Sequence, residues 1–473
     1  MASDLCFTSG RELAESIRAR KISAREVMSA FLRQIDRVNP KINAIVAKLD
    51  DDNCLALADE ADRRLARGDV VGPLHGLPFA FKDLDAAVGF PMTRGSPIFK
   101  DFMPSEDSAL VERLRGAGVL AIGKTNVSEF GMGSHSYNEV YGTTLNPYDL
   151  TKSAGGSSGG AGAALAAGLL PLASGSDLGG SLRNPANFNN IVALRPTVGL
   201  VPAAPAALPF WGFSVKGPMA RSVTDVAFLL SAMAGAHARD PAVYPSEPSV
   251  FAKPLDRDFR DVRVAWCPDL GGLPLDRRVR SVLEAQRKTF TGLGCEVEDA
   301  CPDLIGADEI FLTLRAWNYW HTLGPLLKEH RAKMKEEAVW QIESGSRYSG
   351  AEVAQAMNRH GELMERMRRF QDEYEFLVCA VNQLPPFDAA MHWPREIEGV
   401  AMENYLSWMK SAYWISATFH PAISVPAGFT DDGLPVGIQI VGRYRDDLGV
   451  LQIAHAFEQA TGFGMRRPDI AMG

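Results

Sequence analysis

The chain has 473 residues, 46% of them hydrophobic and 22% charged, and its 49 basic and 57 acidic side chains give a net charge of −8. This composition is that of an ordinary folded protein, which excludes the collagen-like, disordered and disulfide-scaffold classes. A nucleic acid or an acidic membrane would favour a basic face, so the charge balance predicts neither as a partner. Glycine and serine concentrate between residues 131 and 199.

The start of the chain and its cysteines predict a cytoplasmic location. Residues 1–7 lack the basic segment and apolar core of a signal peptide. The six cysteines are scattered without a C-x-x-C pair, too sparsely for a disulfide framework, which favours a reducing compartment. The apolar run at 161–173 is too short to span a bilayer, so no membrane partner is expected.

Residues 1–70 read as helices, and the pattern then changes. Ser23 and Glu26 fit the S-x-x-E capping box, and apolar residues recur after them at helical spacing until Asn39-Pro40 ends the run. From Leu77 onward, short apolar runs alternate with helical stretches, which predicts an α/β fold with a mostly buried sheet. The predicted strands include 77–81, 119–122, 423–425 and 436–441, and the predicted helices include 107–115 and 448–459.

No internal repeat or long linker marks a domain boundary, so a single domain over residues 1–473 is expected. Its predicted parts are N-terminal helices (1–70), a glycine-rich core (71–215), a variable, mainly helical region (240–415) and C-terminal strands with a helix (416–473). Aromatic residues gather toward the end of the chain. They fit an apolar or aryl substrate pocket and ordinary core packing equally well: Trp317, Tyr319, Trp320, Trp408, Tyr413 and Trp414.

Two short motifs suggest chemistry that their context does not favour. Residues 118–125 match the Walker A pattern G-x4-G-K-[ST], but a helix precedes them and the middle residues V-L-A-I read as a strand. Residues 155–159 match the G-x-S-x-G nucleophile elbow of α/β-hydrolases, which needs a buried strand immediately before it. The preceding residues 149–154 are polar and turn-like, although nine histidines leave a Ser-His-Asp enzyme as an open alternative. No metal-ligand spacing such as HExxH occurs, so no metal is expected.

The glycine- and serine-rich clusters at 153–160 and 174–183 flank an apolar helical segment. A flexible linker would be polar throughout, whereas tight glycine turns at the ends of regular elements indicate close backbone approach, often to a ligand. Successive N–H groups at 177–181 could form an anion-binding nest around a serine hydroxyl. This arrangement suits an oxyanion better than it suits a linker.

A serine nucleophile needs a base, and Lys82 is the candidate because no histidine is evident. It ends the apolar run 77–81, where burial would lower the pKa of its ammonium toward neutrality. Asp83 would point to the opposite face of a strand and would not neutralise it. A lysine that reaches the surface explains the local pattern equally well.

Four segments in register, 72–83, 123–126, 153–160 and 175–183, resemble the amidase signature family, and 421–428 with 433–443 is similar too. The resemblance runs from about residue 10 to 460 with a weak stretch at 240–415. It implies a single large α/β domain whose central mixed, twisted β-sheet is covered by helices on both faces. No cofactor is implied.

The resemblance implies a Ser–Ser–Lys triad. Its nucleophile is the serine of G-G-S-L-R, Ser181, and its bridging serine is the first of G-G-S-S-G-G, Ser157, held on a cis peptide bond. The lysine of P-x-x-x-K-D, Lys82, is the base. The implied reaction passes a proton from Ser181 through Ser157 to Lys82 while Ser181 attacks an amide carbonyl.

The same resemblance assigns supporting roles around the triad. The N–H groups of Leu178, Gly179 and Gly180 would stabilise the oxyanion. Substrate-side backbone would lie near Gly131 and Met132. Asp177 would orient the loop, and Arg183 would brace it rather than bind substrate.

The expected activity is hydrolysis of a small-molecule carboxylic amide to acid and amine, with carbamates and esters as further candidate substrates and a homodimer as an open assembly state. The alternatives are an amidotransferase subunit that hydrolyses glutamine for a partner, and a silent binding protein. The intact triad argues against the silent protein. Residues 203–211, A-A-P-A-A-L-P-F-W, replace the R-Y-G-L-type segment usual in the tRNA-dependent glutamine amidotransferase subunit, which weakens that alternative.

Overall fold

The computed structural model describes residues 2–472, and its N-terminal part is helical as expected. The capping box of Ser23 and Glu26 is present, but the helix passes through Pro40 and ends at Asn43, which adopts a left-handed conformation. The predicted end at Asn39-Pro40 is therefore wrong, because a proline in the last turn removes only one helical hydrogen bond. The helices are α1 (Ala2–Phe7), α2 (Gly10–Arg18), α3 (Ala24–Ile42) and α4 (Asp51–Arg67).

The central sheet has eight strands and mixed pairing, which confirms the predicted α/β class. Strand β11 runs parallel to its two neighbours, and the other adjacent pairs are antiparallel. In spatial order the strands are β12 (Glu296–Asp299), β11 (Arg263–Trp266), β13 (Phe376–Ala380), β17 (Pro435–Gly442), β16 (Ala422–Phe429), β9 (Val192–Arg195), β10 (Val215–Ala220) and β8 (Ala173–Asp177).

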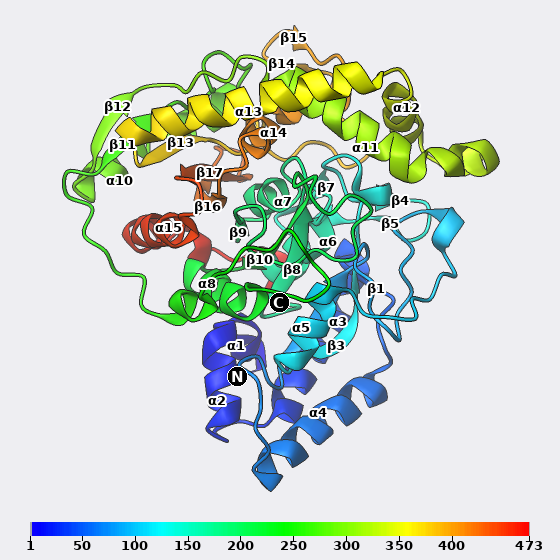
Figure 1. Ribbon diagram of the computed structural model, residues 1–473. Coiled ribbons are helices and arrows are strands. Elements are labelled where there is room, and N and C mark those ends of the chain that lie inside the picture. Colours follow the sequence, from blue (N-terminus) through cyan, green and yellow to red (C-terminus); the bar gives the residue numbers. More distant parts are fainter. Residues whose placement is uncertain (1, 473) are drawn as a thin grey trace.

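Helices cover both faces of the middle strands. Successive residues along a strand point to opposite faces, so one strand contacts helices on both sides. Ile438 and Ile440 of β17 join the core that contains helix α15 (Asp447–Thr461). Gln439, between them, accepts a hydrogen bond from Arg183 of helix α7 (Arg183–Phe188) on the other face. Further helices around the sheet are α5 (Ala109–Gly116), α6 (Gly159–Ala166), α8 (Val223–Met233), α9 (Arg277–Glu284) and α10 (Arg287–Gly292) (Figure 1).

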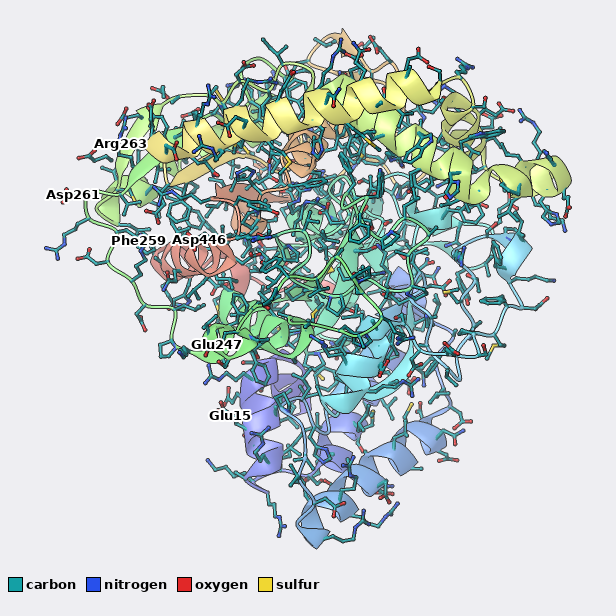
Figure 2. The ribbon with its side chains drawn as sticks, in the orientation of Figure 1. Glu15, Glu247, Phe259, Asp261, Arg263 and Asp446 are labelled. Carbon is teal, nitrogen blue, oxygen red and sulfur yellow. A yellow bond between two sulfur atoms is a disulfide. The ribbon has the colours of Figure 1, made fainter. Side chains whose placement is uncertain are left out.

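A second group of helices lies together at one end of the molecule, at the top of Figure 1. Three of the four pack over a second apolar core, and the fourth, residues 336–345, packs in a smaller third apolar cluster. Side chains fill the interior between sheet and helices (Figure 2). The group comprises α11 (Ala307–His330), α12 (Glu336–Gly345), α13 (Gly350–Glu373) and α14 (Lys410–Ala417).

Short strands complete the fold. A three-stranded sheet has the order β1 (Ile45–Val46), β3 (Leu120–Thr125) and β2 (Pro78–Lys82). The Walker-like segment is thus largely strand β3, as expected from its apolar middle. Three two-stranded pairs are β4 (Tyr137–Asn138) with β5 (Gly142–Thr143), β6 (Leu145–Asn146) with β7 (Asp149–Ser153), and β14 (Glu396–Ile397) with β15 (Val400–Ala401).

One disulfide joins Cys267 and Cys301, whose Cα atoms lie 5.3 Å apart. The two cysteines are 34 residues apart in sequence, but they follow the adjacent parallel strands β11 and β12. The scattered spacing of the cysteines does not predict this pairing. None of the helices within residues 2–472 combines the length and apolar character needed to cross a membrane.

Substitution of Phe290 tests how much the apolar packing between α10 and α15 contributes to stability. Phe290 is fully buried and stacks on Phe457 with ring centroids 5.1 Å apart. We expect Phe290→Ala to lower the free energy of unfolding by about 3–5 kcal/mol, because it removes buried apolar surface and leaves a cavity. Phe210→Ala is the matched control, since Phe210 is 75% exposed. Urea unfolding measures both, and equal losses would contradict this placement of Phe290.

Candidate active site

Lys82 ends strand β2 with its side chain fully buried, so the surface-lysine alternative is wrong. Its Nζ donates hydrogen bonds to the hydroxyls of Ser157 (2.8 Å), Ser158 (2.8 Å) and Ser176 (2.9 Å), and to the Ser176 carbonyl (3.3 Å). Every one of these acceptors is uncharged. The ammonium is therefore held by dipoles alone, without a carboxylate in contact.

Burial lowers the pKa of Lys82 to about 7. The positive charge of Lys216 contributes to this shift, whereas Asp85 and Asp177 oppose it. Lys216 reaches the site because it pairs with Ser176 across the antiparallel strands β10 and β8, and it forms an ion pair with Asp85. A substantial fraction of Lys82 is thus neutral near pH 7 and able to accept a proton.

Asp83 does not compensate the charge of Lys82, as strand alternation predicted. Its carboxylate accepts hydrogen bonds from the backbone N–H of Thr93 (3.1 Å) and from the Thr93 hydroxyl. Burial raises the pKa of Asp83 to about 6. The two consecutive charged residues therefore belong to separate polar networks.

Ser157 lies just before helix α6 and is 2% exposed. The Gly156–Ser157 peptide bond is cis, as the resemblance implied. Gly131 lies against this serine: a Cβ on Gly131 would stand 3.5 Å from Ser157 Oγ and 2.9 Å from Leu84 Cδ1, at a φ of +72°. Glycine is needed there for both space and backbone conformation.

Ser181 lies between strand β8 and helix α7 and is 7% exposed. The N–H of Ser158 donates to the Ser181 carbonyl at 3.2 Å, which ties the two serine-bearing segments together. The Ser181 hydroxyl has no hydrogen-bond partner among residues 2–472. The structure therefore gathers Lys82, Ser157 and Ser181 at one place and leaves the last hydroxyl free.

Asp177 holds the loop that carries Ser181. Its carboxylate accepts hydrogen bonds from the backbone of Gly180 (2.7 Å) and Leu182 (3.2 Å), and it pairs with Arg183 (3.0 Å) and Arg195 (3.2 Å). Burial alone would raise the pKa of Asp177, but the two arginines and these hydrogen bonds hold it well below its usual range. Arg183 also donates to the Ala412 carbonyl and the Ser416 hydroxyl, so it braces the loop as expected.

One of the expected oxyanion donors already has a partner within the protein. The N–H of Gly180 donates to the Asp177 carboxylate. Within the described chain, the N–H groups of Leu178 and Gly179 have no acceptor. A Cβ on Gly179 would lie 2.7 Å from Phe311 Cζ, so only glycine fits between this loop and helix α11.

Met132 and the aromatic residues named from the sequence lie in different surroundings. Met132 is buried in an apolar cluster, and its carbonyl accepts a hydrogen bond from Lys335 Nζ at 3.1 Å. Tyr413 stacks on Phe311 at 4.4 Å and lies against Gly179. Trp408 packs into the core against Phe188.

The nucleophile-elbow alternative does not fit the site. The segment before Ser157 contains β7, a strand of a two-stranded pair rather than of the central sheet. No histidine contacts Ser157 or Ser181 in the described residues, and His135 binds Ser153 instead (2.7 Å). Groups of three or more potential metal ligands are likewise absent from residues 2–472.

Three residues of the site were missed from the sequence: Ser158, Ser176 and Lys216. Ser158 and Ser176 lie inside the glycine-rich segments, so their position alone could have marked them. Lys216 carries no local signal, because its proximity to Lys82 depends on the pairing of β10 with β8.

The site thus combines two serine hydroxyls with a buried lysine. An amidase family model matches residues 26–451, and the chain belongs to this family of amide-hydrolysing enzymes. It is 35% identical to an acylamidase of Rhodococcus erythropolis over 98% of both chains. It is also 31% identical to a glutamyl-tRNA(Gln) amidotransferase subunit of Thermosynechococcus vestitus, over 97% of this chain and 99% of that protein.

Solved structures agree with this assignment. The crystal structure of a bacterial aryl acylamidase belonging to the amidase signature enzymes superposes with a TM-score of 0.90 at 28% identity over 99% of both chains. The 6-aminohexanoate cyclic dimer hydrolase, complexed with its substrate, superposes with a TM-score of 0.86 at 26% identity, over 99% of this chain and all of that one. The chain therefore has the amidase signature fold and acts on amide C–N bonds.

The buried ion pairs of Asp177 with Arg183 and Arg195 lead to a prediction about stability. We expect Asp177→Asn to lower the free energy of unfolding at pH 7 by about 3–5 kcal/mol, because it leaves Arg183 and Arg195 buried without a carboxylate. The folded pKa of Asp177 lies below its unfolded value. Its stabilising contribution is therefore complete above about pH 4 and is lost as the pH falls further, a loss that the variant should not show.

Urea unfolding as a function of pH measures this contribution. Asp258→Asn is the control, because Asp258 forms an exposed ion pair with Arg260 and its loss should leave unfolding unchanged. Indistinguishable behaviour of the two variants would refute the role given to Asp177.

Proposed function

We propose that the chain is a stand-alone amidase with Ser181 as nucleophile, Ser157 as proton relay and Lys82 as general base. The observation that carries this proposal is the contact of 2.8 Å between Ser157 Oγ and a fully buried Lys82 Nζ whose pKa is about 7. A lysine in this state can take a proton from a serine near neutral pH.

In the first half-reaction, neutral Lys82 accepts the proton of Ser157 while Ser157 accepts that of Ser181. The Ser181 oxygen then forms a bond to the amide carbonyl carbon. The free N–H groups of Leu178 and Gly179 stabilise the negative charge on the carbonyl oxygen, and loss of one such donor costs about 3–4 kcal/mol in comparable enzymes. The C–N bond breaks as the proton returns along the same path to the leaving nitrogen.

In the second half-reaction, water attacks the acyl-enzyme ester and gives its proton to the same relay. The carboxylic acid leaves, and Ser181 regains its proton. The same acyl transfer applies to carbamates and esters, so these are further substrates in this proposal. Every proton is passed among Lys82, Ser157, Ser181 and the reactants.

We infer that the substrate is a small acyl amide, with an aryl group as one candidate part. The names of the acylamidase and aryl acylamidase relatives support this class, and Tyr413 and Phe311 place aromatic surface beside Gly179. We also propose that the protein is cytoplasmic and that it hydrolyses the amide without a nucleic acid. The second candidate is a glutamine-hydrolysing subunit, which the 31% identity to an amidotransferase component supports.

Activity of the isolated chain separates these two candidates. A stand-alone amidase should release aniline from a small aryl amide such as an acetanilide without any added protein. An obligate subunit should be inactive toward the anilide and should release ammonia from glutamine only with its partner. Inactivity toward a panel of aryl and alkyl amides would contradict the proposed function.

Covalent labelling tests the assignment of the nucleophile. A fluorophosphonate probe should modify Ser181, identified by peptide mapping. Ser181→Ala should lose labelling and lower kcat by about three to six orders of magnitude, as in other enzymes whose nucleophile is removed. Ser29→Ala is a matched control on an exposed helix surface, where the hydroxyl only donates to Arg25. A label on any other serine would overturn the assignment.

The pH dependence tests the base. Because only neutral Lys82 accepts a proton, kcat/KM should rise with pH through a midpoint near 7. Lys216→Met removes a positive charge that lowers the pKa of Lys82 and releases the opposing charge of Asp85, so the midpoint should move to higher pH. The exposed Lys253, changed to Met, should leave it in place. A midpoint that stays or falls in the Lys216 variant would argue against Lys82 as the base.

A further inference from the structure

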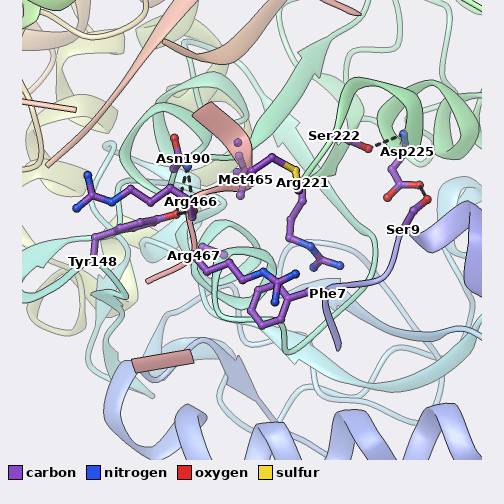
Figure 3. A pocket seen from close by; sticks show the side chains of 13 residues that line it. Phe7, Ser9, Tyr148, Asn190, Arg221, Ser222, Asp225, Met465, Arg466 and Arg467 are labelled. Atoms are coloured by element: carbon purple, nitrogen blue, oxygen red, sulfur yellow. Dashed lines mark hydrogen bonds between the residues drawn. The ribbon is translucent and has the colours of Figure 1, made fainter. Parts of the chain in front are cut away.

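A second polar cavity lies away from the serines, between helix α1, the start of helix α8 and the C-terminal residues 464–467 (Figure 3). Its volume is about 180 Å³. Drug-sized ligands usually occupy cavities of roughly 300–1,000 Å³, so this one suits a small molecule or ion. Three arginines and one carboxylate line it: Arg221, Arg466, Arg467 and Asp225.

The carboxylate is already committed to another element. Asp225 accepts hydrogen bonds from the Ser9 hydroxyl (2.7 Å) and from the backbone N–H groups of Gly10 (2.9 Å) and Arg11 (3.0 Å), at the start of helix α2. It forms no ion pair within 4 Å with any arginine of the cavity in the described chain. The cavity therefore carries excess positive charge in a protein whose net charge is −8.

Arg221 and Arg467 gather around one ring. Their guanidinium carbons lie 5.4 Å and 4.2 Å from the centroid of Phe7, and Figure 3 shows both groups directed toward it. Burial lowers the pKa of Arg221, the charges of Asp225 and Cys6 oppose this shift, and the charge of Arg467 adds to it, so the two cations lie close enough to repel each other. Phe7 attracts both cations through the face of its ring, but it supplies no net negative charge to neutralise them.

Both guanidinium groups keep unused donors. Arg221 donates to the carbonyls of Leu165, Leu170 and Thr8, which uses three of the five N–H groups of a guanidinium. Arg467 makes no hydrogen bond or ion pair within residues 2–472. Planar guanidinium groups with free N–H bonds match the paired oxygens of phosphates and carboxylates.

We propose that this cavity binds a small oxyanion, a phosphate or a carboxylate, between Arg221 and Arg467. The ion would connect the N-terminal helix, the start of α8 and the C-terminal segment, and it would neutralise the repulsion between the two cations. Binding to the folded chain alone stabilises it in proportion to the logarithm of the ion concentration above Kd. This site is independent of the serine–lysine chemistry.

Isothermal titration and thermal unfolding with inorganic phosphate, benzoate and chloride at equal ionic strength test the proposal. Phosphate, benzoate or both should bind and raise the unfolding temperature beyond the effect of chloride, and which of them binds identifies the class of oxyanion. Arg467→Gln should weaken that binding by about tenfold or more, since it removes charged hydrogen bonds to the ion. Arg467→Lys keeps the charge and should lose less.

Arg466→Gln is the matched control. Arg466 is the adjacent residue and has the same charge, but its guanidinium stacks on Phe429 at 4.0 Å and points away from Phe7 (Figure 3). Its removal should leave the affinity within about twofold, because an exposed charge at this distance is screened by salt. The proposal is overturned if neither oxyanion exceeds chloride, or if Arg467→Gln and Arg466→Gln weaken binding equally. Amide hydrolysis by both variants should stay intact, which verifies that they fold.

Discussion

The burial of one lysine ammonium among neutral oxygens is the constraint on which this site depends. Removing a charge from water is costly, and the usual solution in a protein interior is a carboxylate in contact with it. Such a contact would hold the proton on Lys82 and abolish its use as a base. The fold instead surrounds Nζ with three hydroxyls and a carbonyl. These groups satisfy hydrogen bonds without supplying a full negative charge.

Nearby carboxylates are kept from Lys82 by partners of their own. Asp83 is held by Thr93, Asp85 by Lys216, and Asp177 by Arg183 and Arg195. The contacts that keep Asp177 away from Lys82 also shape the loop that carries Ser181. The Asp177 carboxylate accepts a hydrogen bond from the N–H of Gly180 and so fixes this loop. Within residues 2–472, a loop fixed in this way leaves the backbone N–H groups of Leu178, Gly179 and Ser181 without an acceptor. The absence of a carboxylate in contact with Lys82 and the shape of the Ser181 loop thus both depend on the partners of Asp177.

The sequence allowed the local part of this arrangement to be predicted. Lys82 at the end of an apolar strand, the capping box at Ser23 and the strand inside the Walker-like segment each follow from residues that are close together in the chain. The resemblance added the cis bond before Ser157. What it could not supply was the direction of a single N–H group, and the hydrogen bond from Gly180 to Asp177 was therefore not predicted.

Contacts between distant segments explain the other differences. Lys216 affects Lys82 only because β10 pairs with β8 in one register, and a shift by one residue would turn its side chain to the other face. Cys267 and Cys301 meet because two parallel strands end side by side. Neither register nor strand order can be read from composition or spacing, so these contacts were beyond a sequence-based prediction.

The border of the site shows where substrate preference must arise in this family member. The chemistry lies in segments that resemble the family closely, whereas Phe311 and Tyr413, which close over Gly179, belong to helices α11 and α14 in or beside the stretch where the resemblance is weak. In the proposed mechanism, a substrate whose carbonyl oxygen reaches the N–H of Gly179 would lie near these rings. The reaction can therefore be common to the family while the acceptable acyl group depends on residues outside its motifs.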